Sequence, residues 1–513
     1  MDIGSNIVAT KDDLLNIGIT LDKLKEDLTL PNPEYSRTVR FNKGRFYKKI
    51  DPYLCYLEVK GDKYIIPRYY VEDCECDNDY RVTGRSLSSH SFIKLRDYQE
   101  DFINANLSTI NAHSGVLIEA PCGHGKTVMG LWLSYMRGVQ TMILVPTYYL
   151  AEQWKQRIKE FSDSSVFIVK STDKEVPIDS DFTIVSLDLF SCRHLPNELV
   201  ENIGHIILDE AHRVGADTYL PILNEIPAFY RTALTATFRR SDGVHRILKY
   251  HFGEHIKMNN RFPKPRIYTF RTNVRIKYLL SKSKKYVAFL DFLDSQGVRY
   301  RETKSAIEFD EPVERLRVVL ENIYKRGDIR KTPYHEVASC LKRSLEMPYS
   351  VVDSYLNEHS GRRKQSIRLI QECLNAGRTV LFLSKRKDIL RSLHKYFAKY
   401  KPMLIIGDNK LSNAEVEYLQ NTCPLIFGVT QLAKEGLDID RLDTLIIHLP
   451  IKDTEQAIGR ISRLCDKKRF PIGIYLLDDC PITYAVFNNS KKFMAINAEY
   501  KGDISLKNIS SVL

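Results

Sequence analysis

The sequence predicts an α/β protein that contains two parallel-sheet domains, a β-rich N-terminal domain and a small α+β insertion. Two series of short apolar runs support this fold class, because the runs end in polar or glycine-containing turns and alternate with helix-like stretches. The first series lies within residues 91–260, and the second lies within residues 360–513. A chain of 513 residues is also too long for one ordinary core, since a domain commonly holds about 100–200 residues.

Residues 1–90 form the predicted β-rich domain. Stretches rich in aromatic and β-branched residues at 53–59 and 64–70 predict strands, and turns are expected at Gly61-Asp62 and Asn78-Asp79. The polar start of the chain predicts a helix. Because the opening MDIGSNIVATKDDLL lacks the basic start and apolar stretch of a secretion signal, we expect a cytoplasmic protein, in the bacterial host cytoplasm if a phage encodes it.

The strands of the two α/β domains are predicted from their apolar runs. Those of the first domain are GVLIEA, TMILVP, FTIVSL, HIILDE and RTALTA. Those of the second domain are TVLFLS, MLIIG, PLIFGV, TLIIHLP and GIYLLD. Runs that are apolar throughout are typical of strands buried on both faces, so we expect each sheet to be parallel and covered by helices on both sides.

Residues 271–345 break this rhythm and predict the inserted module. We expect a helix over 286–293, a short hairpin formed by 298–300 and 305–309, and a further helix. The apolar face of that further helix comprises Val313, Leu316, Leu320 and Ile323. The module holds 17 Lys/Arg against 10 Asp/Glu, whereas the whole chain has a net charge of +12. This excess favours a polyanionic partner through counterion release, and a solvated basic face is the alternative.

The composition narrows the class of protein. No uncharged apolar run is long enough to span a bilayer, so we expect no membrane protein. The ten cysteines lack the spacing of a zinc site or a disulfide framework, which predicts reduced thiols. The close pair Cys74 and Cys76 has no second pair to complete a metal site.

A phosphate-binding loop follows the first apolar run and reads Ala120-Pro-Cys-Gly-His-Gly-Lys-Thr127. Gly123 and Gly125, which flank His124, let backbone N–H groups face phosphates at a helix N-terminus. Lys126 is expected to neutralise the β- and γ-phosphate oxygens, and Thr127 to offer a hydroxyl to Mg²⁺. A chance match is the alternative, but a strand precedes this loop and an apolar helix follows it. The loop therefore predicts ATP and Mg²⁺ as cofactors.

Two adjacent carboxylates end another apolar run, Ile206-Ile-Leu-Asp-Glu-Ala-His212. We expect Asp209 to hold Mg²⁺ and Glu210 to orient and deprotonate the attacking water, because phosphoryl transfer depends on positioning and charge stabilisation. An acidic turn at a strand end is the alternative.

The loop and Asp209-Glu-Ala-His212 together resemble the ATP site of DEAH-type superfamily 2 helicases. The resemblance implies two RecA-like motor domains that hydrolyse ATP while moving on nucleic acid. It implies that Arg96 and Gln99, in RDYQ, recognise adenine. The residues that it implies in coupling hydrolysis to strand movement are His212, Thr235 and Thr237.

The resemblance also implies nucleic-acid contacts in both domains. In the first domain these are Pro146, Thr147 and Tyr148, in VPTYYLAEQW, and Ser186. In the second domain they are Ser384, Lys385 and Thr430, while Asp438 is expected to bind nucleotide.

A last motif, Q-x-x-G-R-x-x-R, comprises Gln456, Arg460 and Arg463. Its spacing places the two arginines on one helix face, from which they could cross the cleft between the domains and stabilise charge on the γ-phosphate. A surface arginine pair is the alternative.

Within superfamily 2, the motifs RDYQ, PCGHGKT, VPTYYLAEQW and LTATFRR resemble the XPB-like branch, which includes phage and large DNA-virus members. Asn32-Pro-Glu-Tyr35, Gly44 and Ile65-Ile-Pro-Arg68 resemble the N-terminal segment of phage branch-migration helicases of the UvsW type, with Tyr69 where Gly is expected. The resemblance implies a 3′–5′ DNA helicase or translocase that acts on single-stranded, forked or branched DNA in replication, recombination or repair. The alternatives are an RNA helicase or transcription-associated ATPase, a restriction-enzyme motor, and a DNA-binding scaffold with a silent ATPase site.

Overall fold

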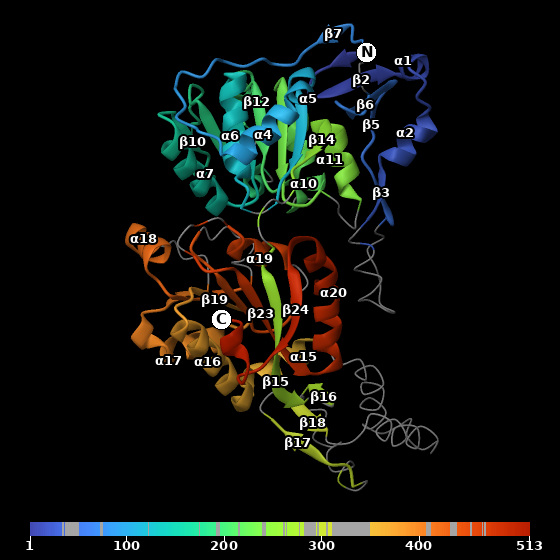
Figure 1. The fold of residues 1–513 in the computed structure, drawn as a ribbon. Coiled ribbons are helices and arrows are strands. Elements are labelled where there is room, and N and C mark those ends of the chain that lie inside the picture. The colour runs from blue at the N-terminus through green and yellow to red at the C-terminus, as the bar shows by residue number, and fades with distance from the viewer. Residues whose placement is uncertain are drawn as a thin grey trace, which may run out of the picture. The chain divides into compact units, whose positions relative to one another are not determined.

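The computed structural model describes most of the chain. The described residues are 1–32, 35, 51–71, 75–121, 123–173, 175–190, 195–213, 216–238, 243–259, 262, 264–275, 278–281, 294, 297–303, 306–309, 349–406, 412–430, 439–451, 454–463, 465 and 468–513. They divide into two compact units, Met1–Arg261 and Phe262–Leu513. Each unit contains a seven-stranded parallel sheet, and the first unit also contains a mixed sheet at the N-terminus, so the predicted α/β fold class is confirmed (Figure 1).

The sheet of the first unit has the strand order β10-β11-β9-β12-β13-β8-β14, and all neighbouring strands are parallel. Its strands are β8 (Gly115–Glu119), β9 (Thr141–Val145), β10 (Val166–Ile168), β11 (Phe182–Ser186), β12 (His205–Leu208), β13 (Tyr230–Thr235) and β14 (Glu254–Lys257). All five predicted strands are confirmed, whereas β10 and β14 were not predicted.

Helices cover both faces of this sheet. They are α4 (Asp97–Ala105), α5 (Leu107–Ala112), α6 (Lys126–Arg137), α7 (Tyr148–Phe161), α8 (Leu187–Phe190), α9 (Asn197–Val200), α10 (Ala216–Glu225) and α11 (Val244–Phe252), with the 3₁₀ turn η1 (Ala211–Arg213). Successive residues of β8 alternate between two cores, because Leu117 belongs to one cluster of buried residues and Val116 and Ile118 belong to the other. This alternation follows from the two-residue period of a strand.

The sheet of the second unit has the order β20-β21-β19-β22-β23-β15-β24, again with parallel neighbours only. Its strands are β15 (Arg266–Arg275), β19 (Val380–Ser384), β20 (Met403–Ile405), β21 (Leu425–Val429), β22 (Thr444–Ile447), β23 (Ile472–Asp479) and β24 (Glu499–Ile504). Counted within each unit, the strands of both sheets follow the same order, 3-4-2-5-6-1-7. The two units therefore repeat one architecture, so positions in one sheet can be compared with positions in the other.

The helices of the second unit include α15 (Tyr349–Glu358), α16 (Ser360–Asn375), α17 (Lys387–Tyr396), α18 (Asn413–Asn421), α19 (Glu455–Ile461) and α20 (Pro481–Asn497), with the 3₁₀ turns η4 (Ala398–Tyr400) and η5 (Ile509–Ser511). The start of the predicted insertion differs from expectation, because residues 271–275 complete β15 in the main sheet.

The predicted hairpin of the insertion is present, but its first strand is Tyr300–Glu302 rather than 298–300. Strands β16 (Tyr278–Ser281), β17 (Tyr300–Glu302) and β18 (Ala306–Phe309) form an antiparallel sheet in which β17 pairs with β18. The two helices predicted over 286–293 and around 313–323 lie outside the described residues.

The N-terminal sheet has the order β5-β6-β2-β1-β7. Its strands are β1 (Asp2–Ile3), β2 (Asn6–Thr10), β5 (Glu58–Lys60), β6 (Lys63–Pro67) and β7 (Asn78–Asp79), and β3 (Thr29–Pro31) pairs separately with β4 (Tyr53–Cys55). The predicted helical start was wrong, because β1 and β2 precede helices α1 (Lys11–Asn16) and α2 (Leu21–Asp27). The predicted turn at Asn78-Asp79 was also wrong, since these residues pair with β1 as β7, whereas Gly61-Asp62 is a turn.

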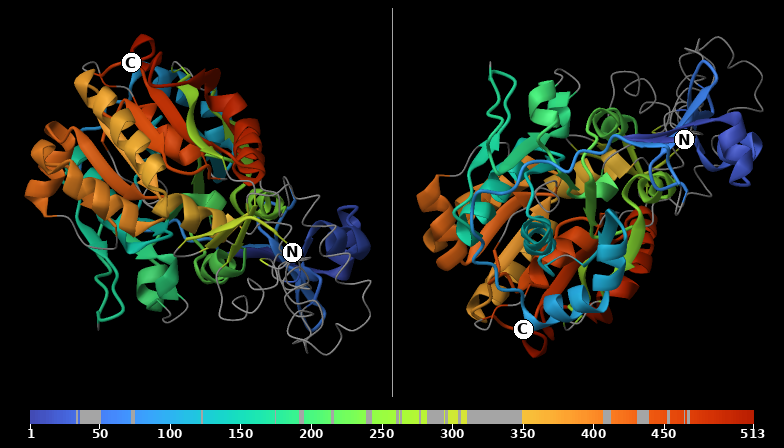
Figure 2. Two further views of the ribbon diagram at one scale, coloured as in Figure 1. Left: turned by 90° about the horizontal axis from the view of Figure 1, so that it is seen from below. Right: turned by 90° about the horizontal axis from the view of Figure 1, so that it is seen from above.

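The N-terminal elements pack at the edge of the first sheet that carries β14 and α11, as both figures show (Figures 1 and 2). Ile7, Leu24 and Ile66 from these elements belong to the same buried cluster as Leu117 of β8. The N-terminal segment and the first parallel sheet therefore share a core. Among the described residues of the whole chain, no helix combines the length and apolarity that crossing a membrane requires.

Candidate nucleotide site and nucleic-acid surface

The phosphate-binding loop connects β8 to α6. Gly123 and Gly125 have φ angles of 83° and 76°, in the left-handed region that glycine adopts at little cost. Gly125 caps α6, and Lys126 and Thr127 are the first residues of that helix. The backbone N–H groups of the first helical turn lack intrahelical partners, so this end of α6 is suited to bind phosphate.

Gln99 of α4 braces the loop. Its Nε2 donates to the carbonyl oxygen of His124 at 2.9 Å, and its Oε1 accepts from the backbone N–H of Arg96 at 3.0 Å. Gln99 is only 3% exposed, and a Cβ atom added at Gly125 would lie 2.3 Å from its Nε2. The resemblance implies adenine recognition by Gln99, but in this structure both ends of its amide bind protein backbone.

Asp209 lies directly after β12 and is buried. Its Oδ1 accepts from the backbone N–H of Glu210 at 2.8 Å, and its Oδ2 accepts from the indole Nε1 of Trp154 at 2.7 Å. Burial, and to a smaller extent the Glu210 charge, raise the pKa of Asp209 to about 6, although the Trp154 hydrogen bond and the Lys126 charge act in the opposite direction. The structure thus brings Lys126 and Asp209 into one electrostatic environment.

A chain of polar contacts runs from Glu210 to the end of β13. Glu210 has a positive φ of 48°, which is uncommon for a residue with a side chain, and its carboxylate lies 3.3 Å from Nδ1 of His212. That Nδ1 also lies 3.1 Å from Oγ1 of Thr235, and Thr235 Oγ1 donates to the carbonyl oxygen of Thr237 at 2.9 Å. The residues expected to couple hydrolysis to movement are therefore in contact with one another and with Glu210.

The expected nucleic-acid contacts of the first unit gather at the carboxyl ends of two neighbouring strands. Pro146, Thr147 and Tyr148 follow β9, and Ser186 ends β11, where it pairs with Val145. Thr147 is the N-cap of α7, and its side chain accepts from the backbone N–H three residues later.

The expected contacts of the second unit occupy the equivalent strand ends. Ser384 ends β19 and Lys385 follows it, and Thr430 follows β21, the neighbour of β19. The backbone N–H of Thr430 donates to the carbonyl oxygen of Ser384 at 3.1 Å. Lys385 extends its ammonium group over the ring of Tyr349, 4.7 Å from the ring centroid. The repeated architecture thus brings these residues together within each unit.

The arginine motif differs from expectation. Gln456 and Arg460 lie on α19, but that helix ends at Ile461, so Arg463 lies beyond it and does not share its face. Arg463 Nη1 instead lies 3.6 Å from Oδ1 of Asp440. The prediction that Arg460 and Arg463 lie on one helix face was wrong, because the helix ends before Arg463. Asp438 lies outside the described residues.

Trp154 has no role in the sequence interpretation, although it belongs to VPTYYLAEQW. Its position among the apolar residues of α7 predicts only a core residue. A buried indole N–H normally finds an acceptor, and this requirement is the signal that could have suggested a polar partner.

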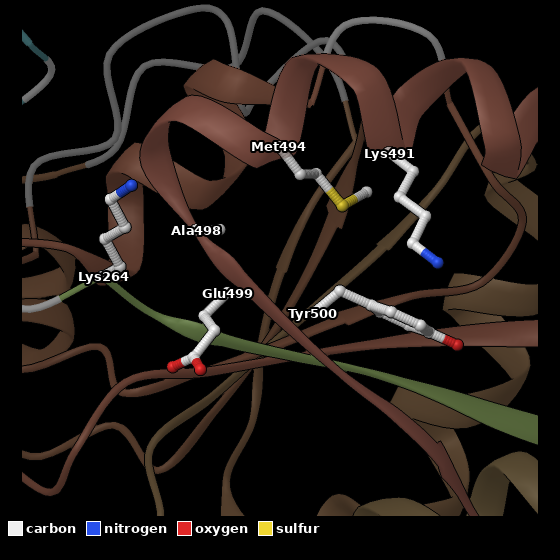
Figure 3. Close-up of a pocket in the computed structure, with 6 residues that line it drawn as sticks. All are labelled: Lys264, Lys491, Met494, Ala498, Glu499 and Tyr500. Carbon is white, nitrogen blue, oxygen red and sulfur yellow. The ribbon is translucent and has the colours of Figure 1, made fainter.

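A separate pocket of about 460 Å³ lies in the second unit, between α20 and the start of β24 (Figure 3). It is lined by Lys264, Lys491, Met494, Ala498, Glu499 and Tyr500. The ammonium group of Lys491 lies 3.7 Å from the centroid of the Tyr500 ring. Because none of the expected site residues lines this pocket, it is distinct from the candidate nucleotide site.

Comparison with known proteins finds relatives that are named as helicases or translocases. Residues 92–240 match the family model described as type III restriction enzyme, res subunit. A protein of Acanthamoeba polyphaga mimivirus, provisionally named an ATP-dependent RNA helicase, is 23% identical over 476 residues, which span 90% of this chain and 78% of that protein. The DNA 3′–5′ translocase XPB2 of Sulfurisphaera tokodaii is 29% identical over 217 residues, which span 40% of this chain and 47% of that protein.

Solved structures show the same fold. Two structures of S. cerevisiae Dbp5 bound to RNA and ADP BeF₃ match with TM-scores of 0.51 and 0.50 at 14% identity, covering 82% of this chain and 92% of theirs. This likeness indicates two RecA-like domains. The matched family model and the relatives named as helicases or translocases support placing this chain among the superfamily 2 helicases.

Proposed function

We propose that this protein is an ATP-dependent helicase or translocase that moves 3′ to 5′ on DNA. The observation that carries this proposal is the continuity of the candidate site, in which Lys126, Asp209 and Glu210 meet the contact chain that ends at Thr237. A DNA-binding scaffold with a silent ATPase site has no need of such a connected set of residues. The side chains of the candidate site supply the cation, the carboxylates and the polar contacts on which phosphoryl transfer depends.

The residues at this site fit a magnesium ion. Mg²⁺ prefers oxygen ligands, and the Asp209 carboxylate and the Thr127 hydroxyl are the groups that would hold it. Asp209 uses one lone-pair site of each oxygen for protein donors, and a carboxylate has about four such sites, so positions remain for a cation. When bound, the ion would neutralise charge on the β- and γ-phosphates.

The chain's own groups supply the remaining steps. Lys126, at the start of α6, binds the β- and γ-phosphate oxygens, and the loop N–H groups orient them. Glu210 positions the attacking water and takes its proton. The contact of Glu210 with His212, and of His212 with Thr235, then carries the change in charge to the end of β13.

Movement along a strand needs nucleic-acid contacts on both units. The candidates occupy equivalent strand ends, after β9 and β11 in the first sheet and after β19 and β21 in the second. We propose that both sets hold one strand backbone and that Arg460, with Arg463, completes the ATP site from the second unit. ATP binding and hydrolysis then alternately close and open the two units.

DNA is the proposed substrate because the motifs resemble the XPB-like branch and because one relative is named a DNA 3′–5′ translocase. Forked or branched DNA is the proposed structural preference, supported by the resemblance of the N-terminal segment to phage branch-migration helicases. RNA is the second candidate, since the mimivirus relative is named for RNA.

A single panel tests these proposals. ATP hydrolysis and strand separation are measured with single-stranded, tailed duplex, forked and four-way DNA and with matched RNA. We expect DNA to stimulate hydrolysis, and forks and junctions to be processed at lower enzyme concentration than a tailed duplex. If only RNA stimulated ATP hydrolysis, RNA rather than DNA would be the substrate. Equal activity on all DNA forms would contradict the proposed preference for forked or branched DNA. Absence of hydrolysis on every substrate would contradict the helicase proposal.

A further inference from the structure

Trp154 joins the helix that starts at the candidate nucleic-acid surface to the candidate magnesium carboxylate. It lies on α7, six positions after Tyr148, which corresponds to about 9 Å along the helix axis. Its Nε1 donates to Oδ2 of Asp209 at 2.7 Å. One rigid helix thus has the candidate strand contacts Thr147 and Tyr148 at its start and a direct bond to Asp209 further along.

The indole is held firmly in place. Trp154 is 1% exposed and packs in the buried cluster that fills one face of the first sheet. A Cβ atom added at Gly130 of α6 would lie 3.3 Å from Cη2 of the indole, so the ring also contacts the helix of the phosphate-binding loop. The ring therefore cannot turn without displacing α6 or α7.

The hydrogen bond restricts the carboxylate. An indole N–H can only donate, so this bond keeps Oδ2 of Asp209 turned toward α7. The Glu210 N–H holds Oδ1 from the other side. With both oxygens held, the carboxylate is fixed in one orientation, and a displacement of α7 changes that orientation directly.

We propose that Trp154 is a positioning residue that orients Asp209 for Mg²⁺ and transmits to it the position of α7, so that nucleic acid bound at the start of α7 alters ATP hydrolysis. This inference rests on the proposed function and adds a route by which substrate regulates the site. Residues that orient metal ligands commonly change metal affinity or activity by about 10–100-fold. The competing view is that Trp154 only fills the core.

The chain provides a matched control, since it has only two tryptophans, Trp132 and Trp154. Trp132 lies on α6 and is half-buried, and it has no contact with Asp209 among those of the described residues. Trp132→Phe therefore serves as the reference, and it leaves Trp154 as the only tryptophan. The fluorescence of Trp154 can then be followed without measuring activity.

The first measurement is fluorescence of the Trp132→Phe protein during titration with Mg²⁺, MgADP and a DNA oligonucleotide. We expect MgADP and DNA each to shift the Trp154 emission, because the indole bonds directly to the carboxylate and lies on α7. An emission that responds to neither overturns the proposal, and this holds even if Trp154 variants fail to fold.

The second measurement compares steady-state hydrolysis by Trp154→Phe and Trp132→Phe. The phenyl ring retains most of the packing but donates no hydrogen bond. We expect Trp154→Phe to lower kcat and raise the Mg²⁺ concentration for half-maximal activity by about tenfold or more, with little change in KM for ATP. The stimulation by DNA should also decline. Trp154→His, whose ring N–H can donate, should recover part of each effect.

The outcomes separate this inference from the proposed function. Equal kcat, Mg²⁺ dependence and DNA stimulation in Trp154→Phe and Trp132→Phe would leave Trp154 as core packing only and overturn the proposal. If the unsubstituted protein hydrolyses no ATP, the proposed function fails. In that case the emission of Trp154 during titration with MgADP still shows whether the surroundings of Trp154 change when nucleotide binds.

Discussion

Arg231 of β13 donates from Nη2 to the backbone carbonyl of Ser5 at 2.8 Å, which ties a central strand of the first sheet to the N-terminal sheet. From the other side, Arg68 donates from Nη1 to the carbonyl of Ala228 at 2.6 Å. Both arginines are buried, and both bind backbone oxygens. The N-terminal segment is therefore fastened to the strand whose end carries Thr235.

This relationship predicts that Arg231→Met destabilises the first unit. The variant leaves the carbonyls of Ser5, Leu223 and Ile226 without this donor. Each buried carbonyl without a partner costs about 1–3 kcal/mol. Because the variant also removes a charge whose burial is unfavourable, part of this cost is offset. We therefore expect the free energy of unfolding to fall by about 2–4 kcal/mol. Thermal and denaturant unfolding measure it.

Arg157→Met is the matched control, because Arg157 pairs with Glu160 near the surface of α7. Its free energy of unfolding should change by less than about 1 kcal/mol. A stability gain in Arg231→Met would show that the cost of burying the charge exceeds the value of its hydrogen bonds.

The loop brace predicts a non-additive pair of substitutions. Gly125→Ala places a Cβ atom 2.3 Å from Nε2 of Gln99 and forces alanine into a φ of 76°. The conformation alone costs about 1–2 kcal/mol. Because the strained loop relaxes and phosphate binding must restore its shape, we expect this cost to appear as about a tenfold loss of kcat/KM for ATP. Gln99→Ala removes the close contact but not the backbone strain.

We therefore expect the double variant to be less impaired than the product of the two single losses predicts. Steady-state ATP hydrolysis by the three variants measures the coupling. Multiplicative losses would mean that Gln99 and the loop act independently.

We expect substitutions of Lys126 and of Glu210 to impair ATP hydrolysis in different ways. Lys126→Ala should abolish turnover and weaken ATP binding, because it removes the loop's charged phosphate ligand. Glu210→Gln should bind ATP and stall, because an amide cannot take the proton of the attacking water. Hydrolysis assays and binding of a fluorescent ATP analogue distinguish the two variants.

Lys249→Ala on α11, which removes only a surface pair with Glu254, is the control. Near-normal hydrolysis in either site variant would contradict the assignment.

The arginine motif predicts unequal effects. Arg460→Ala should lower kcat by about a thousandfold, as expected for loss of an arginine finger, with little effect on DNA affinity without nucleotide. Arg463→Ala should also lower kcat, but it additionally removes the contact with Asp440 at 3.6 Å.

Asp440→Asn separates these two contributions of Arg463. If Asp440→Asn reproduces the loss seen in Arg463→Ala, the role of Arg463 is to hold its own unit together. If Asp440→Asn is nearly normal, Arg463 acts on the nucleotide. Normal turnover in Arg460→Ala would remove it from the ATP site.

The predictable part of the fold is the part buried on both faces. Strands β8, β9 and β12 are covered on both sides, so they appear as continuous apolar runs, and their ends marked the candidate site. The edge strands β10, β14 and β24 expose part of their side chains and have no such runs, so they were missed. The interior strand β15 was also missed, because polar residues interrupt the apolar run in its sequence RIYTFRTNVR.

Other features depend on contacts that spacing does not encode. The end of α19 at Ile461 separates Arg460 from Arg463, although a continued helix would align them. The hydrogen bond of Trp154 to Asp209 joins residues 55 positions apart, and the indole otherwise has the pattern of a core residue. Arg231 was visible as a cation at the start of an apolar run, but its carbonyl partners are set by the tertiary fold.

The repeated architecture also shows what occupies the second unit at the place of the nucleotide site. His448 follows β22 as Asp209 follows β12, and each donates its backbone N–H at 2.9 Å to the strand next to it. Arg362 of α16 is buried beside it, with Nη1 2.9 Å from the His448 ring and Nε 2.8 Å from Oδ1 of Asp478. Burial and the Arg362 charge hold the pKa of His448 well below its usual value, so the imidazole is neutral.

This arrangement predicts one nucleotide per chain. Where the first unit has the carboxylate of Asp209 after its fifth strand, the second unit has His448, and a buried guanidinium lies between His448 and Asp478. Calorimetric titration with a non-hydrolysable ATP analogue should give a stoichiometry of one, and Lys126→Ala should weaken this single binding event. Asp478→Asn should leave the stoichiometry unchanged while destabilising the second unit by about 3–5 kcal/mol, because the Arg362 charge remains buried without its carboxylate. A stoichiometry of two, or binding of unchanged affinity in the Lys126→Ala protein, would mean that the second unit binds nucleotide despite this ion pair.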